Sequence, residues 1–285
     1  MMATILDGKK LAEAIREKVK TRVAALPTPP GLAVILVGDD PASHTYVALK
    51  ARACAQAGIR FEQWSYAADE SEEALIKKIR ELNAREEIHG ILVQLPLPAQ
   101  DADHVIAAID PMKDVDGFHP MNLERLESGK PAIASAVALG IMKLISEAPH
   151  RTGSTATIVS SPLFAKPLKI LLREQGISAV VLAPDVPDLS AQTRTADVLI
   201  VAVGQPGLIT RDGVKPGAVV IDVGTTRTDA GLKGDVDFNA VAPIAGAITP
   251  VPGGVGPMTV ALLLVNILKA YDLQRRGDGE PRSRN

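Results

Sequence analysis

The chain of 285 residues is long enough for one large or two modest α/β domains, and a hydrophobic content of 46% suffices for a packed core. Its formal net charge of −2 argues against a broad nucleic-acid surface, and its single cysteine, Cys54, excludes an internal disulfide. Charged residues within positions 1–19 argue against a signal peptide, and no stretch has the length and apolarity expected of a membrane span. We therefore expect a cytoplasmic protein that binds neither nucleic acid nor membrane.

Short apolar runs alternate with helical patterns in the first part of the chain. Residues 32–37 are a continuous apolar run, which is typical of a strand covered on both faces. Asp40-Pro41 is typical of a helix start, and Gly58 of a helix end. The next expected elements are a strand over 60–66, a helix over 71–83, a strand over 90–94 and a helix after Asp101. Such a βαβ series forms a parallel sheet.

A second series of elements follows a lapse in hydrophobic periodicity between residues 117 and 129. The pattern predicts helices over 135–147, 165–175 and 257–271, and strands over 155–159, 179–182, 198–203, 218–223 and 247–251. The polar residues from Gln274 onward are expected to form a disordered tail. The fold class that we expect is therefore α/β, with two domains built on parallel sheets.

Tyr46 and Lys50 lie four residues apart within the first predicted helix. On a helix this spacing places both side chains on one face, where a ring and an amine can hold a flat polar heterocycle. A lysine that exchanges protons near neutral pH needs burial or a positioned neighbour. An amphipathic surface helix with an exposed lysine fits the same spacing.

Gln94 closes the predicted strand 90–94 and is followed by Leu-Pro-Leu-Pro. Ligands of open α/β sheets bind beyond the carboxyl ends of the strands, so this amide is suited to bond a lysine or a substrate. The alternative is a polar residue that merely closes the strand.

The segment Lys113-Asp-Val-Asp-Gly117 places two carboxylates around a valine. A carboxylate such as Asp116 can accept a pair of N–H bonds from a 2-amino-pyrimidinone ring, as it does from guanidinium. Two acids without further ligands are too few for a dedicated metal site, so we expect no metal. A plain turn is the alternative for this segment.

The segment Pro250-Val-Pro-Gly-Gly-Val-Gly-Pro-Met-Thr259 combines prolines that fix an approach with glycines that let backbone come close to a ligand. Pro257 then suits the start of a helix, where N–H groups can hold an anion or an amide. A purely structural turn is the alternative.

Taken together, these segments resemble the bifunctional methylenetetrahydrofolate dehydrogenase/methenyltetrahydrofolate cyclohydrolase family, the FolD type. The matching stretches run from the first predicted helix to the last. They are Tyr46-Val-Ala-Leu-Lys50, Gly90-Ile-Leu-Val-Gln-Leu-Pro-Leu-Pro98, Lys113-Asp-Val-Asp-Gly-Phe-His-Pro120, Gly217-Ala-Val-Val-Ile-Asp-Val-Gly224, Gly234-Asp-Val-Asp-Phe238 and Ile248-Thr-Pro-Val-Pro-Gly-Gly-Val-Gly-Pro-Met-Thr259.

The resemblance implies two linked reactions of one-carbon metabolism, which serves purine biosynthesis. Methylene-tetrahydrofolate loses a hydride to NADP, and water then opens the resulting methenyl cation to 10-formyl-tetrahydrofolate. The resemblance makes Lys50 the catalytic amine and Gln94 the residue that orients it. It places Tyr46 against the folate ring system and Asp116 on the pterin, with Pro252, Gly253 and Gly254 also at the substrate.

The resemblance also implies a folate-side catalytic domain of residues 1–118 with 257–285, and a Rossmann-like domain of residues 119–256 for the nicotinamide cofactor. Homodimers are usual in the family. The residues that would bind NADP are Ser160, Ser161, Gly204, Pro206, Asp222, Gly224, Thr225 and Thr259.

The expected cofactor loop, residues 159–167, departs from the family pattern because it contains no glycine. Pro162 removes an N–H donor and Phe164 adds bulk where backbone should approach phosphate. An acid after the next strand, Asp185, suits a ribose hydroxyl and would favour NAD. The alternative function is therefore a cyclohydrolase without redox activity, or a folate-binding paralogue.

Overall fold

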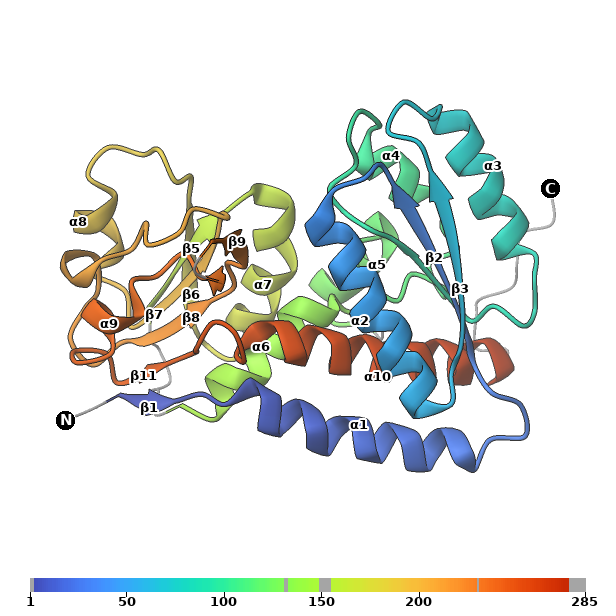
Figure 1. The fold of residues 1–285 in the computed structure, drawn as a ribbon. Coiled ribbons are helices and arrows are strands. Elements are labelled where there is room, and N and C mark those ends of the chain that lie inside the picture. The colour runs from blue at the N-terminus through green and yellow to red at the C-terminus, as the bar shows by residue number, and fades with distance from the viewer. Residues whose placement is uncertain (1–2, 131–132, 149–154, 230, 277–285) are drawn as a thin grey trace. The chain divides into compact units, whose positions relative to one another are not determined.

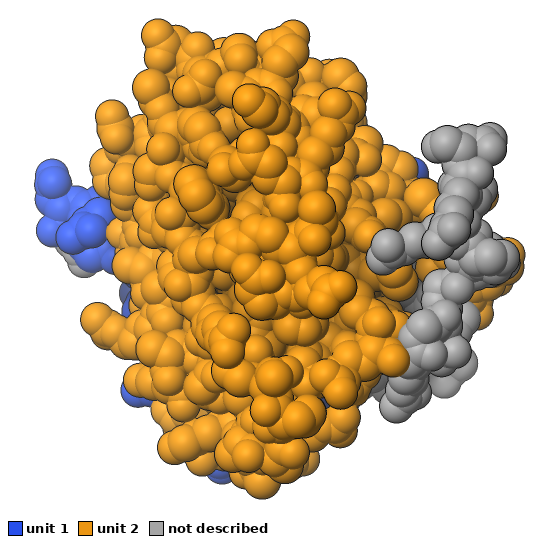
Figure 2. All heavy atoms as spheres, turned by 90° about the vertical axis from the view of Figure 1, so that its right-hand side faces the viewer, with its two compact units in different colours: residues 1–12, 137–259 blue, residues 13–136, 260–285 orange. Residues whose placement is uncertain are grey.

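The computed structural model describes residues 3–130, 133–148, 155–229 and 231–276 (Figure 1). The chain divides into two compact units, which Figure 2 colours separately. Unit 1 contains residues 1–12 and 137–259, and unit 2 contains residues 13–136 and 260–285.

Unit 2 is built on a parallel sheet of three strands in the order β3-β2-β4. Its strands are β2 (Gly31–Val37), β3 (Arg60–Tyr66) and β4 (Gly90–Val93). Its helices are α2 (Pro41–Ala57), α3 (Glu72–Asn83), α4 (Ala102–Ala107) and α5 (Pro120–Glu127), with most of α1 (Gly8–Ala24) and α10 (Val255–Arg276). The predicted parallel βαβ series is confirmed.

Local signals set the limits of α2 as the sequence predicts. The Asp40 carboxylate accepts the Ser43 N–H at 2.8 Å, and Pro41 follows at the first helical position. Gly58 ends the helix with a φ of 77°, a left-handed conformation that glycine adopts at little cost. These caps fix which turn of α2 carries Tyr46 and Lys50.

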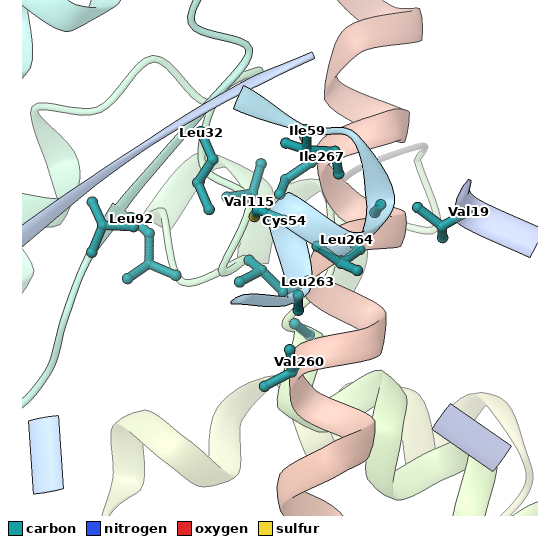
Figure 3. Packing of buried hydrophobic residues seen from close by; sticks show 14 of the residues in the cluster. Val19, Leu32, Cys54, Ile59, Leu92, Val115, Val260, Leu263, Leu264 and Ile267 are labelled. Atoms are coloured by element: carbon teal, nitrogen blue, oxygen red, sulfur yellow. The ribbon is translucent and has the colours of Figure 1, made fainter. Parts of the chain in front are cut away.

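The strand β2 is buried along its whole length, and its side chains alternate between two apolar clusters. Leu32, Val34 and Leu36 pack with residues of α1, α2 and α10, whereas Ala33, Ile35 and Val37 pack with residues of α3 and α4. Figure 3 shows the first cluster, which includes Leu263, Leu264 and Ile267 of α10 together with Leu32 and Cys54. The strand β2, which bears no polar side chain, is therefore the central strand of the sheet.

Unit 1 is built on a parallel sheet of six strands in the order β1-β11-β8-β7-β5-β6. The strands are β1 (Thr4–Ile5), β5 (Thr155–Ser160), β6 (Ser178–Leu182), β7 (Val198–Ala202), β8 (Val219–Asp222) and β11 (Ala247–Ile248). Strands β9 (Thr226–Thr228) and β10 (Gly231–Lys233) form a separate antiparallel pair. The helices of this unit are α6 (Ala136–Ser146), α7 (Pro162–Glu174), α8 (Leu189–Thr193), α9 (Phe238–Val241) and the 3-10 helix η1 (Arg211–Gly213).

Two compact units with parallel sheets confirm the predicted α/β class. Their limits differ from the domain boundaries that we expected at three places, one of which is residues 257–259, which cluster with unit 1. Residues 1–12 cluster with unit 1, because Thr4 and Ile5 pair with Ala247 and Ile248 of β11. Residues 119–136 cluster with unit 2.

The helix α10 corrects the expectation that no stretch is long and apolar enough to span a membrane. By length and composition alone, Val255–Arg275 qualifies, with a mean hydropathy of 1.3, and it is the one such helix among the described residues. More than half of the apolar part of this helix is buried inside the protein, and Leu263, Leu264 and Ile267 belong to the core of unit 2. The core therefore accounts for its apolar side chains. The expected polar tail from Gln274 falls mostly outside the described residues, whereas residues 274–276 continue the helix.

Candidate functional site

Lys50 lies on α2 and is buried, with a residue exposure of 7%. Its Nζ donates a hydrogen bond of 2.8 Å to Oε1 of Gln94, which follows the last residue of β4. The Gln94 amide nitrogen in turn donates to the Leu95 carbonyl at 2.8 Å, so the side-chain oxygen is turned toward the lysine. The predicted contact between Lys50 and Gln94 is confirmed.

The environment of Lys50 favours its neutral form. Burial lowers the pKa of the Lys50 amine below its ordinary value, while the charge of Asp116 raises it in part. Burial likewise raises the pKa of the Asp116 carboxyl, opposed by the charge of Lys50. The pKa of the amine is lowered and the pKa of the carboxyl is raised, so both groups can exchange protons nearer to neutral pH than exposed groups do.

Cys54, one turn further along α2, does not share this reactivity. It is fully buried, and burial raises the pKa of its thiol to about 12 despite the charge of Lys50. The thiolate is the nucleophilic form of cysteine, so Cys54 acts as a small apolar core residue.

Tyr46 stands one helical turn before Lys50 on α2 and is half-buried, which leaves part of its side chain accessible. The predicted shared face of Tyr46 and Lys50 follows from the continuous helix between them. A partly exposed ring next to a buried amine suits a flat ligand that covers the ring and reaches the amine.

The two acids of the Asp114–Asp116 segment have different roles. Asp114 is buried, and its carboxylate accepts hydrogen bonds from the Gly117 N–H at 3.0 Å, the His119 N–H at 2.8 Å and the Asn122 amide at 3.0 Å. Through these three hydrogen bonds, Asp114 stabilises the turn. Asp116 is half-buried, and its side chain takes part in none of the hydrogen bonds found among the described residues. Its carboxylate is therefore available to a ligand.

Asn266 of α10 fixes this segment from a distant part of the sequence. Its side-chain amide donates bonds of 2.9 Å to the carbonyls of Val115 and Ala134, on either side of the segment that carries Asp116. Gly117 lies between them with a φ of 78°, and a Cβ there would stand 2.4 Å from the Ala134 backbone. Sequence reasoning missed Asn266, because no local pattern distinguishes it from other polar positions on an apolar helix.

We expect Asn266→Ala to destabilise the protein by about 2–4 kcal/mol, because two buried carbonyls lose their donor and stay unsatisfied. Urea unfolding followed by circular dichroism measures the change. Asn239→Ala, at an exposed position of α9, is the matched control and should leave the free energy of unfolding nearly unchanged. Equal stability of the two variants would contradict the structural role of Asn266.

The glycines of the 250–259 segment are required in part by packing within unit 1. A Cβ on Gly8 would meet the Gly254 carbonyl oxygen at 1.9 Å, and the Lys9 N–H donates to the Gly253 carbonyl at 2.9 Å. Gly253 has a φ of 112°, which a residue with a side chain rarely adopts. Pro252 is exposed, and the helix begins at Val255, two residues before the predicted start.

The loop that follows β5 starts the helix α7 at Pro162 rather than at the predicted Ala165. Ser160 is buried, whereas Ser161 is exposed and caps the helix by accepting the Phe164 N–H at 3.4 Å. The Ala165 N–H is bound to the Ser161 carbonyl at 3.1 Å, and Pro162 has no N–H. The helix start therefore offers fewer backbone donors to a phosphate than a glycine loop does.

The turns after β7 and β8 carry most of the other predicted cofactor residues. Gly204 and Pro206 are exposed, Thr225 is half-buried and Gly224 is buried. Gly204 has a φ of 71°, and the nearest atom to a Cβ there is Thr226 Oγ1 at 3.9 Å, so its backbone can be approached closely. Thr259, in the first turns of α10, is half-buried and donates to the Val255 carbonyl at 3.2 Å.

Asp222 differs from this group because its carboxylate is turned into the protein. It is 4% exposed and accepts hydrogen bonds from the backbone N–H groups of Gly224, Asp235 and Val236 at 2.9–3.0 Å. Burial raises the pKa of Asp222 to about 7, and the charge of Asp235 adds to that rise. Asp235, which sequence reasoning did not select, is fully buried beside it.

Comparison with known families matches the two parts of the chain to two domains of one family. Residues 6–116 match the model of the catalytic domain of tetrahydrofolate dehydrogenase/cyclohydrolase, and residues 135–275 match that of its NAD(P)-binding domain. The bifunctional protein FolD of Bordetella avium is 51% identical over 279 residues, which cover 95% of this chain and 98% of that protein. That of Geobacillus thermodenitrificans is 48% identical over 277 residues, with coverage of 95% and 98%.

Solved structures give the same result. The bifunctional enzyme FolD of Campylobacter jejuni is 40% identical, covers 95% of this chain and 99% of its own, and superposes with a TM-score of 0.88. The methylenetetrahydrofolate dehydrogenase-cyclohydrolase of Trypanosoma brucei, complexed with NADP and an inhibitor, is 34% identical with a TM-score of 0.91 and coverage of 97% and 99%.

Proposed function

Because this chain belongs to the tetrahydrofolate dehydrogenase/cyclohydrolase family, we propose that it is a bifunctional enzyme that interconverts 5,10-methylene-, 5,10-methenyl- and 10-formyl-tetrahydrofolate with NADP. The observation that carries the proposal is the buried Lys50 amine, held by Gln94 at 2.8 Å and shifted toward its neutral form. A purely folate-binding protein has no need of such an amine.

In the hydrolytic step, Lys50 acts as the general base. A water oxygen bonds to the bridging carbon of the methenyl cation, and a proton of that water passes to the Lys50 amine. The bond between that carbon and N5 then breaks as N5 takes up the proton held by Lys50. The added hydroxyl loses its own proton as it becomes the formyl C=O on N10, so that one proton is released overall. Gln94 holds the amine in place through the cycle, and Asp116 and Tyr46 hold the pterin.

Residues of unit 1 fit a nicotinamide dinucleotide in part. NADP supplies the hydride acceptor for the methylene group when it is bound. The backbone around Gly204 is open to close approach, and the turn that contains Gly224 and Thr225 lies at the end of the neighbouring strand β8. Ligands of such sheets bind beyond the carboxyl ends of the strands, so we assign the dinucleotide to these turns and to Ser161.

The start of α7 favours the second candidate function, a cyclohydrolase without redox activity. Pro162 lacks an N–H, and Ser161 uses the donors of Phe164 and Ala165. Membership of the family and the similarity to bifunctional FolD proteins favour the first candidate, which carries out both the dehydrogenase and the cyclohydrolase reactions.

Two assays on the purified protein separate the two functions. Methylene-tetrahydrofolate is mixed with NADP, and separately with NAD, while the reduced nicotinamide is followed at its absorbance band. Hydrolysis of the methenyl cation is followed in the absence of nucleotide. Both reactions together support the bifunctional enzyme, hydrolysis alone supports the second candidate, and neither reaction would contradict both.

We expect the cyclohydrolase rate to rise with pH, with a midpoint below the ordinary lysine pKa of 10.5. The neutral amine is the base, its fraction grows as pH passes the pKa, and burial lowers that pKa. Lys50→Arg is the charge-matched control, because guanidinium stays protonated throughout the range. Its residual rate should lack the rise, and an identical rise in both proteins would assign the titration to another group.

We also propose that the enzyme works in the cytoplasm as a homodimer and supplies formyl groups for purine biosynthesis. The buried, reduced Cys54 supports a reducing compartment. The edge strand β6 supports self-association, because none of the described strands pairs with its outer side and Val180 is 56% exposed. Light scattering after size exclusion should give twice the chain mass, and a monomer would contradict the dimer.

A further inference from the structure

Two acidic side chains, Asp222 and Asp235, are buried in the interior of unit 1, with exposures of 4% and 0%. Neither belongs to the ion pairs formed among the described residues. Burying a carboxylate without a cation is costly unless hydrogen bonds compensate for the lost water. The partners of both groups are backbone N–H groups, and their positions show what the two acids hold.

Asp222 is the last residue of β8, and its carboxylate joins two segments. One oxygen accepts the Gly224 N–H at 3.0 Å and the Asp235 N–H at 2.9 Å, and the other accepts the Val236 N–H at 3.0 Å. Its own backbone is fixed by Thr249, whose hydroxyl accepts the Asp222 N–H at 2.8 Å. The turn after β8 is thereby tied to residues 235 and 236.

Asp235 extends this connection to the neighbouring strand. Its Oδ2 accepts the N–H groups of Val203 at 2.7 Å and Gly204 at 3.1 Å, which begin the turn after β7. Its Oδ1 is buried without a hydrogen-bond partner in the protein. A buried carboxylate oxygen without a hydrogen bond lowers the stability of the protein. This cost argues that Asp235 has a role in placing the turn.

Glycine is required wherever the backbone passes these carboxylates. A Cβ on Gly224 would stand 2.3–2.6 Å from the Asp235 carboxyl atoms, and one on Gly234 would stand 1.9 Å from Asp222 Oδ2. The two turns and the two acids therefore form one close-packed group at the carboxyl ends of β7 and β8, which are adjacent strands.

We propose that Asp222 and Asp235 are positioning residues of the dehydrogenase half-reaction, which hold the turns at Val203–Gly204 and Val223–Gly224 in the shape that receives the dinucleotide. The inference rests on the proposed function, which assigns these turns to the cofactor. Asp222, which the sequence suggested as a cofactor ligand, acts through the backbone and does not touch the cofactor. The hydrolytic centre around Lys50 does not depend on the two acids.

The test compares Asp235→Ala with Asp235→Asn and with Asp212→Ala, an exposed acid of unit 1. NADP affinity is measured by fluorescence titration, KM for NADP and kcat by reduction, and hydrolysis of the methenyl cation separately. We expect Asp235→Ala to raise Kd and KM for NADP by roughly 10-fold or more, because two backbone donors are released, with kcat and hydrolysis changed much less. Asp235→Asn keeps one carbonyl acceptor and should restore most of the affinity.

Gly224→Ala provides a second variant that keeps both acids, should Asp235→Ala fail to fold. Its methyl group would displace the Asp235 carboxylate, so it should also raise Kd for NADP and spare hydrolysis. Unchanged NADP affinity in folded variants would overturn the positioning role and leave the proposed function intact. Equal losses of hydrolysis and NADP binding would overturn it in favour of a general structural role. A wild-type protein that binds no NADP would overturn this inference together with the dehydrogenase assignment.

Discussion

Lys50→Met is expected to lower the cyclohydrolase rate by roughly 10²–10⁴-fold, the usual consequence of losing a positioned acid or base. Methionine keeps an unbranched chain of similar length, so the packing around position 50 should be preserved, while the amine that bonds Gln94 is lost. The rate is measured as loss of methenyl-tetrahydrofolate absorbance at saturating substrate. Binding of the folate itself should change much less than the rate, because Asp116 and Tyr46 remain.

The free energy of unfolding of Lys50→Met shows whether a loss of activity comes from the missing amine or from a damaged fold. Removing the buried Lys50 amine relieves the cost of burying a polar group, but leaves the Gln94 oxygen without its donor, and the two effects oppose each other. We expect only a small change in the free energy of unfolding. Lys77→Met, at an exposed position of α3, is the control for the substitution itself. Normal hydrolysis by Lys50→Met would remove this residue from the mechanism.

Elements whose signals are local were predicted closely from the sequence. The strand over residues 60–66 and the helix between Pro41 and Ala57 have the expected limits, because aromatic residues mark the first, and an acid and a glycine cap the second. The strand β1 was missed. It has two residues, both exposed, and exists because it pairs with β11, more than two hundred positions away. Nothing in its own sequence indicates that partner.

The candidate site divides in the same way. Lys50 and Gln94 were predictable because a helical spacing and a strand end each limit where a side chain can lie, and the resemblance joined them. Asn266 and Asp235 act on backbone groups that are distant along the chain or lie beyond a hairpin, so their roles depend on tertiary structure. Asp222 shows the limit of motif transfer, because the motif identifies the residue but does not indicate that its carboxylate binds backbone N–H groups of the protein.

Asp116→Ala is expected to weaken folate binding by roughly 10²–10³-fold, as two charge-assisted hydrogen bonds to the pterin are lost. The surrounding turn should survive, because Asp114 and Asn266 hold it through backbone groups and do not use the Asp116 side chain. Titration calorimetry with a tetrahydrofolate derivative measures the loss, and a parallel titration with NADP should give an affinity close to that of the wild type.

Two further variants make the result specific to the carboxylate. Asp103→Ala removes an exposed acid of α4 from the same unit and should leave both affinities unchanged. Asp116→Asn keeps the shape, but its amide presents a donor where the pterin also donates, so it should bind folate nearly as weakly as the alanine variant. Because the charge of Asp116 raises the pKa of Lys50, either substitution should also move the rise of the hydrolytic rate to lower pH. Loss of NADP affinity with folate affinity retained would show that Asp116 belongs to the dinucleotide site.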